Sequence, residues 1–177
     1  LMFIGQERRE IKTLLDDGAY SDSLALAGAY LSRNPKQEEV ASWGQQALIK
    51  AVLPGWMDHL ENERYDQAMH RIIASNNAAA PIPDGRAMLD LLDWATRMEM
   101  HIGLRGGTEA PIRIFTHESE TLALIEQWQS DAALNQRLLT QMSALEPEFE
   151  PVQRRILGNL RLLRNENALY GAAIALL

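Results

Sequence analysis

Residues 14–35, LLDDGAYSDSLALAGAYLSRNP, contain the end of one helix, a turn, and a complete second helix. A helix over residues 6–17 is expected to end near Gly18, because glycine readily adopts the left-handed conformation that closes helices. In the following helix the apolar side chains recur at the three- and four-residue spacing of a buried face. Pro35 ends that helix, because the residue before a proline is driven out of the helical conformation. The stretch therefore predicts two short helices joined by a tight turn.

The pattern recurs later in the chain. A single offset of 45 residues aligns Leu15 with Leu60, Tyr20 with Tyr65, and Ser23 with Ala68.

Between the two copies we expect a third helix over residues 37–53, closed by Pro54-Gly55. A break at residues 75–77 and a turn at residues 81–85 then precede a helix over residues 86–101. Because each helix has one apolar stripe, the helices must stack on one another to bury it.

Seven residues of the first copy form one pattern: Gly18, Tyr20, Ser23, Ala27, Tyr30, Leu31 and Pro35. The pattern resembles the second half of a tetratricopeptide repeat, in which a Gly-x-Tyr turn leads into a helix with small residues and a proline ends the unit. The second copy departs from it, since Glu63 replaces the glycine and Pro81 falls one position late. The offset also exceeds the family's repeat of about 34 residues. The resemblance implies a degenerate helical repeat over residues 6–101 that binds a peptide or protein.

The rest of the chain predicts further helices. Residues 102–117 contain three glycines and a proline, which is typical of a connector with at most one short extended segment near residues 111–115. Residues 118–177 contain three more apolar stripes at helical spacing, and we expect these helices to pack on the first part. The predicted fold is all-α, with stacked antiparallel hairpins and about seven to nine helices in one continuous domain.

Composition excludes several classes of function. The 177 residues carry a net charge of −7, which argues against nucleic acid as a partner, and contain no cysteine, which excludes disulfides and thiolate metal sites. No two of the four histidines have the spacing that binds a metal from one helix face. Phosphate-loop, dinucleotide and nucleophile-elbow motifs are absent from the sequence. We therefore expect no enzyme activity, no metal and no cofactor.

Two sets of residues are candidates for binding a partner protein. The first combines aromatic, thioether and arginine side chains of the repeat region: Trp56, Tyr65, Trp94, Arg97 and Met98. The second is a basic face on the last helix: Arg154, Arg155, Arg161 and Arg164. Core packing is the alternative explanation for the tryptophans and methionines, and a solvated face for the arginines.

The sequence favours a non-catalytic scaffold or adaptor that captures a protein segment. The alternative is a regulatory or sensory domain that binds a small ligand between the two halves, in a pocket lined by Met98, Met100, His101 and Phe115. An enzyme is the third hypothesis, and its sign would be a metal held by His117 with Glu118 or Glu120.

The two ends suggest a longer parent protein. Residues 1–5 are mostly apolar and a charged run follows, which fits either a membrane tether before residue 1 or a start methionine behind one extra residue. Residues 172–177 form an apolar stretch without a helix stop signal. We expect the domain to lie on the cytoplasmic or periplasmic face of a membrane, with the cytoplasm preferred. The sequence does not predict the oligomeric state.

Overall fold

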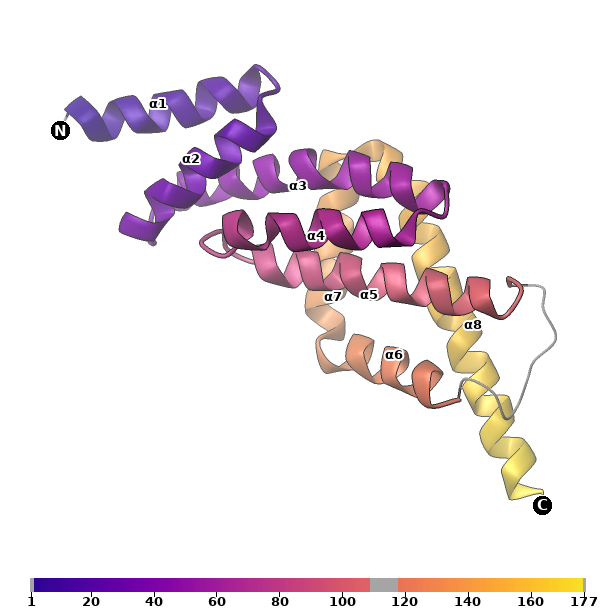
Figure 1. Cartoon of the computed structure of the whole chain (residues 1–177). Coiled ribbons are helices and arrows are strands. Elements are labelled where there is room, and N and C mark those ends of the chain that lie inside the picture. Colours follow the sequence, from indigo (N-terminus) through magenta and orange to yellow (C-terminus); the bar gives the residue numbers. More distant parts are fainter. Residues whose placement is uncertain (1, 109–117, 177) are drawn as a thin grey trace.

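The computed structural model describes residues 2–108 and 118–176, and within these ranges helices joined by short turns make up the chain, without a strand (Figure 1). The all-α prediction is therefore confirmed, and the described residues form eight α-helices and one 3-10 helix. The extended segment expected near residues 111–115 lies outside the described residues. The elements are α1 (Met2–Asp16), α2 (Tyr20–Arg33), α3 (Glu38–Glu61), α4 (Tyr65–Ala79), α5 (Gly85–Leu104), α6 (Glu118–Ser130), α7 (Ala132–Leu145), η1 (Pro147–Phe149) and α8 (Glu150–Ala175).

The first five helices run up and down in two layers. Each of these helices packs on the next one along the chain. In addition, α3 contacts both α1 and α5, and α2 contacts α4. This arrangement places α1, α3 and α5 in one layer and α2 and α4 in the other. Figure 1 shows α3, α4 and α5 nearly side by side, with α1 and α2 crossing at the N-terminal end.

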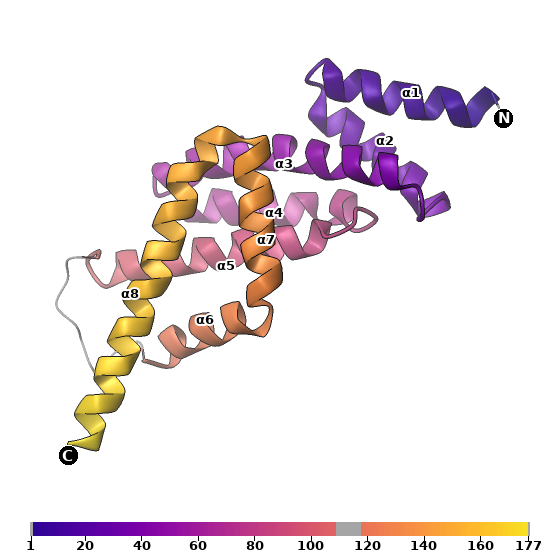
Figure 2. The same ribbon diagram turned by 180° about the vertical axis from the view of Figure 1, so that it is seen from behind.

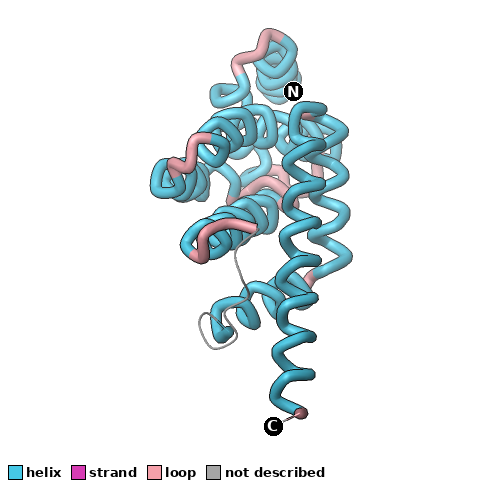
Figure 3. Tube along the Cα trace, turned by 90° about the vertical axis from the view of Figure 1, so that its right-hand side faces the viewer, coloured by secondary structure: helices cyan, strands magenta, loops and turns pink. Residues whose placement is uncertain are grey.

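The last three helices do not extend this stack but cover one side of it. Helix α7 contacts both α3 and α5, while α6 and α8 contact α5. Figures 2 and 3 show α7 and α8 as an antiparallel pair lying across the first-half helices. Because both halves contribute to one cluster of buried apolar side chains, the core is continuous.

The turns before α2 and α4 have the same backbone conformation. Gly18 closes α1 with a φ of 81°, and Glu63, the residue aligned with it, follows α3 with a φ of 55°. The aligned tyrosines, Tyr20 and Tyr65, are the first residues of α2 and α4. The offset of 45 residues therefore aligns structurally equivalent positions of the two helical pairs. At one of them Glu63 adopts a backbone conformation that glycine adopts more easily.

The expected hairpin at Pro54-Gly55 is wrong. Helix α3 continues through Pro54 to Glu61 and absorbs the segment expected to start the second copy. Proline inside a helix costs about 3 kcal/mol. Continuing the helix buries four large apolar side chains after or beside the proline: Leu53, Trp56, Met57 and Leu60. Each such side chain contributes about 1.5–3 kcal/mol when buried, so packing outweighs the proline.

Two other helix boundaries also differ from the expectation. Helix α4 passes through the polar residues 75–77, and the hydroxyl of Ser75 bonds the carbonyl of Arg71 one turn earlier (2.9 Å). Helix α5 extends to Leu104, so the connector starts later than residue 102. After it, Gly106 and Gly107 have φ values of 96° and 97°, which explains why this turn needs glycine.

Trp56 lies at the centre of the core. Its side chain is 0% exposed, and its indole N–H donates a hydrogen bond to the hydroxyl of Thr96 in α5 (2.9 Å). Its ring lies 6.4 Å from that of Phe149 in η1, measured between ring centroids. One side chain thus joins α3 to α5 and to the turn between α7 and α8.

Thr96→Val is expected to lower the free energy of unfolding by about 1–3 kcal/mol, because the buried indole N–H of Trp56 loses its acceptor. Urea unfolding followed by circular dichroism measures the loss. Thr140→Val is the matched control, since this exposed hydroxyl bonds only the carbonyl of Gln136 one turn earlier. Equal losses in both variants would contradict the assigned role of the Thr96 hydroxyl.

Glu63→Gly is expected to raise the free energy of unfolding by about 0.5–1 kcal/mol, because glycine accepts the left-handed conformation without strain. The Glu63 side chain is exposed, so its removal costs little packing. Glu63→Ala keeps the Cβ and should give no gain. Thermal unfolding of the three proteins checks this, and a gain shared by both variants would refute the strain at this turn.

Candidate binding groove

Three of the five residues predicted to bind a partner belong to the core. Trp56, Trp94 and Met98 are 0%, 1% and 0% exposed, so the prediction that they contact a partner is wrong. The indole N–H of Trp94 donates to the carbonyl of Leu124 in α6 (2.8 Å), and its ring stacks obliquely on Trp128, 5.1 Å away. These tryptophans hold helices together, as the alternative explanation from the sequence proposed.

Arg97 is half-exposed and already paired. Its Nε donates to the carboxylate of Asp93 one turn earlier (3.0 Å). Its Nη2 donates to the side-chain oxygen of Gln127 in α6 (2.6 Å). Arg97 therefore links α5 to α6 at the surface.

The predicted basic face loses one of its four arginines. Arg155 turns toward the first half of the chain, where its Nε lies 2.7 Å from Glu99 of α5 and its Nη1 lies 2.8 Å from Glu61 of α3. Burial disfavours the charged guanidinium, but the bonds to Glu99 and Glu61 outweigh it and raise the Arg155 pKa. The other three, Arg154, Arg161 and Arg164, are exposed.

Tyr65 lies beside this ion-pair network at the start of α4. Burial raises the pKa of the Tyr65 phenol above its ordinary value of 10.0, the negative charges of Glu99 and Glu63 raise it further, and Arg155 lowers it. Tyr65 is half-buried. It packs against the core at a junction of α3, α4, α5 and α8 rather than in an open groove.

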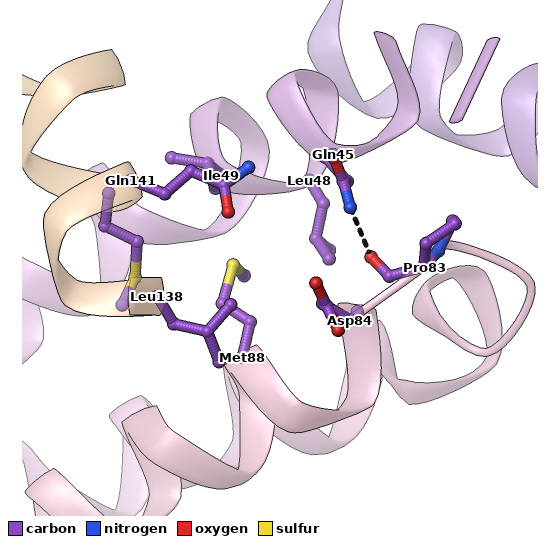
Figure 4. A pocket seen from close by; sticks show the side chains of 10 residues that line it. Gln45, Leu48, Ile49, Pro83, Asp84, Met88, Leu138 and Gln141 are labelled. Carbon is purple, nitrogen blue, oxygen red and sulfur yellow. Dashed lines mark hydrogen bonds between the residues drawn. The ribbon is translucent and has the colours of Figure 1, made fainter. Parts of the chain in front are cut away.

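One pocket between the two halves is too small for a ligand (Figure 4). Helices α3, α5 and α7 line it, and the side-chain amide of Gln45 donates across it to the carbonyl of Pro83 (2.8 Å). Its volume is about 10 Å³, which accommodates roughly one water molecule. A larger hollow of about 240 Å³ lies between α5 and the α6–α7 corner, with Asp90 and Asp131 among its lining residues.

The residues named for the ligand and metal hypotheses do not form an open site where they are described. Met98 is in the core, and His101 is buried with its Nε2 2.8 Å from the Thr121 hydroxyl and its Nδ1 3.6 Å from Glu120. Phe115 and His117 lie outside the described residues. Within the described ranges, no three histidine or acidic side chains are grouped as metal ligands would be.

An open groove lies on the opposite side of the stack, between α2 and α4, with α3 as its floor. Its volume is about 310 Å³, and its lining residues are Ser21, Leu24, Ala51, Val52, Arg71, Ala74, Ser75 and Ala78. Toward one end the two helices converge, because Gly28 of α2 lies close to the backbone of Ala78: a Cβ on Gly28 would stand 3.3 Å from that carbonyl oxygen. Small side chains on all three helices leave the space open.

Arg71 reaches across the floor of this groove. Its Nη2 donates to the backbone carbonyl of Ala51 in α3 (3.2 Å). The guanidinium rests against Gly55, where any Cβ would collide with it. Its Nε is buried and has no hydrogen-bond partner, and no carboxylate of the described residues pairs with this arginine.

The sequence pattern did not predict this groove. Ala74 and Ala78 share a face at helical spacing, which is a signal for close helix packing but not for an opening. Arg71 of α4 contacts Gly55 of α3. The expected helix end at Pro54-Gly55 placed Gly55 in a turn, so this contact between helices was not predicted. Only the continuous α3 places Gly55 under the guanidinium.

Comparisons with known proteins do not assign a function to this groove. No protein-family model, curated protein sequence or solved structure matches the chain. In the part of the chain that the structure describes, no helix combines the length and apolar character required to cross a bilayer. Functional inference therefore rests on the contacts within the chain.

The alkaline stability of the protein is expected to depend on Tyr65. Because the folded state favours the neutral phenol, the stability that Tyr65 contributes is complete below pH 10 and is lost as the pH rises through the raised pKa. Tyr65→Phe cannot ionise, so its free energy of unfolding should fall less steeply between about pH 9 and about pH 11. Urea unfolding across this range tests the difference, with pH 7 values correcting for the lost hydroxyl. Parallel declines would contradict the raised pKa.

Proposed function

We propose that this chain is a non-catalytic helical scaffold domain that binds a segment of a partner protein in the α2/α4 groove. The observation that carries the proposal is the groove itself, which has an apolar floor, small side walls and a cation without a counter-ion among the described residues. Helices α6, α7 and α8 cover the α3/α5 side of the stack and contribute no lining residue to this groove. The resemblance to helical-repeat scaffolds seen in the sequence points the same way.

The surroundings of the groove favour a macromolecular partner. Leu26 of α2 is 36% exposed and Ile73 of α4 is 65% exposed, so both helices present large apolar side chains outside the groove. Neither side chain lines the groove, so a bound segment would have to continue past it to cover them and remove them from water. A small molecule confined to the groove would leave both side chains exposed.

The groove lacks the groups that a hydrolytic or transfer reaction needs. Its two hydroxyls belong to Ser21 and Ser75, and its lining includes no histidine or carboxylate that could act as their base. The Ser75 hydroxyl is already bonded to a backbone carbonyl. This supports binding rather than catalysis at this place.

The wider setting of the proposal rests on the sequence. It places the domain as an adaptor in an assembly or signalling protein on the cytoplasmic or periplasmic face of a membrane. The alternative, a regulatory domain that binds a small ligand between the halves, would use the hollow of about 240 Å³ beside α5.

Site-specific photo-crosslinking in the source cells tests the proposed docking site. A photoreactive amino acid at Ala74, an exposed groove position, is expected to give one discrete adduct with a partner protein. The same probe at Arg161, an exposed position of α8, should give none. Adducts from Arg161 alone would move the docking site to the basic face, and the absence of adducts at both positions would argue against a scaffold.

A further inference from the structure

The α2/α4 groove contains a positive charge that the described part of the protein does not neutralise. Of the three nitrogens of the Arg71 guanidinium, Nη2 bonds the carbonyl of Ala51 and Nε has no partner. By contrast, Arg33, Arg64, Arg97 and Arg155 each pair with a carboxylate. In a chain with a net charge of −7, a half-buried guanidinium without a counter-ion is unusual.

The fold holds this guanidinium in one place. Helix α3 presents the bare backbone of Gly55 to it, and the carbonyl of Ala51 fixes one edge. Because Nε is buried and one N–H of Nη2 is used by Ala51, the N–H groups of Nη1 and the second N–H of Nη2 are the ones left for a planar oxygen acid. The hydroxyl of Ser21 lies in the same groove and can donate to the same ligand, whereas the Ser75 hydroxyl already donates to the carbonyl of Arg71 (2.9 Å).

We propose that Arg71 is the anion-binding point of the groove and that it receives the carboxylate of an aspartate or glutamate side chain from the partner protein. This deepens the function proposed above and rests on it. A carboxylate would pair with the charge of Arg71 in a setting partly shielded from water, where charge-assisted hydrogen bonds are strong. The apolar residues Leu24, Val52 and Ala78 would contact the stem and neighbours of the acidic residue.

The charge distribution favours a single acidic side chain over a polyanion. The groove lining contains one basic residue, Arg71, whereas nucleic acid or an anionic membrane would require several to offset the repulsion of a chain with net charge −7. The guanidinium of Arg71 and the hydroxyl of Ser21 supply donors for one carboxylate, whose two oxygens accept hydrogen bonds.

Selection from a phage library of random twelve-residue peptides tests the proposal on the full chain. The wild-type protein is expected to enrich peptides with Asp or Glu at one fixed position, and one selected peptide then serves as the probe for affinity measurements by fluorescence polarisation. Arg71→Met should bind that peptide about tenfold to hundredfold more weakly. Arg71→Glu should instead enrich Lys or Arg at the same position, which a merely structural arginine would not produce.

Two further variants separate position from charge. Gly55→Ala keeps every charge but places a Cβ where the guanidinium of Arg71 lies. The variant should therefore lower the affinity for the peptide, as Arg71→Met does. Alanine also favours the helix, so circular dichroism should show an intact fold. Arg161→Met removes an exposed charge of α8 and should leave the affinity unchanged.

The outcomes distinguish this proposal from the scaffold function. Enriched peptides without a fixed acidic position, or equal binding by wild type and Arg71→Met, would overturn the role of Arg71 while leaving the groove a docking site. If Arg161→Met lowers the affinity as much as Arg71→Met does, the effect comes from the net charge of the protein, and the proposed role of Arg71 is also overturned. If no peptide is enriched, both this proposal and a peptide-binding groove are contradicted.

Discussion

The burial of Trp56 is the interaction on which the rest of this structure depends. Its ring fills the space between α3, α5 and η1, and its one polar group is satisfied by Thr96. To bring Trp56 there, α3 must continue through Pro54, and the apolar side chains it buries offset the cost of the proline. The continuation of α3 then supplies the Gly55 backbone on which Arg71 rests, next to the groove floor formed by Ala51 and Val52.

Ion pairs between distant parts of the chain fix how the C-terminal helices lie on the stack. Arg155 of α8 joins Glu61 and Glu99, Lys50 of α3 joins Glu146, and Arg105 after α5 pairs with Glu166 of α8 in a largely buried contact. A buried pair of this kind is costly to break because one partner is left without its counter-ion. These contacts hold α7 and α8 against one side of the stack. None of these C-terminal helices lines the α2/α4 groove, where Arg71 lies without a carboxylate partner among the described residues.

The helical fold and much of its register were predictable because they depend on local spacing. Glycine, proline and the apolar stripes located most helices, and the offset of 45 residues matched the starts of α2 and α4. The predicted end of the third helix at Pro54 was wrong, because the cost of a proline inside a helix is local, whereas the burial of apolar side chains that offsets it depends on other helices. The candidate site was mostly wrong for a related reason, since aromatic and thioether side chains suit both a core and a groove. Composition does not separate these two uses, and only the positions of neighbouring helices do.

By itself the sequence determined that this protein is all-helical, acidic and built from stacked pairs, since periodicity and charge act within a few residues of chain. The tertiary structure decided which surfaces are open and which charges are paired. Arg155 and Arg71 illustrate the difference, because both are arginines on amphipathic helices. Glu61 and Glu99 neutralise the first, while the second faces an alanine carbonyl and a glycine backbone. Whether a charge meets a counter-ion depends on residues brought close by packing, and short-range sequence patterns carry no information on that distance.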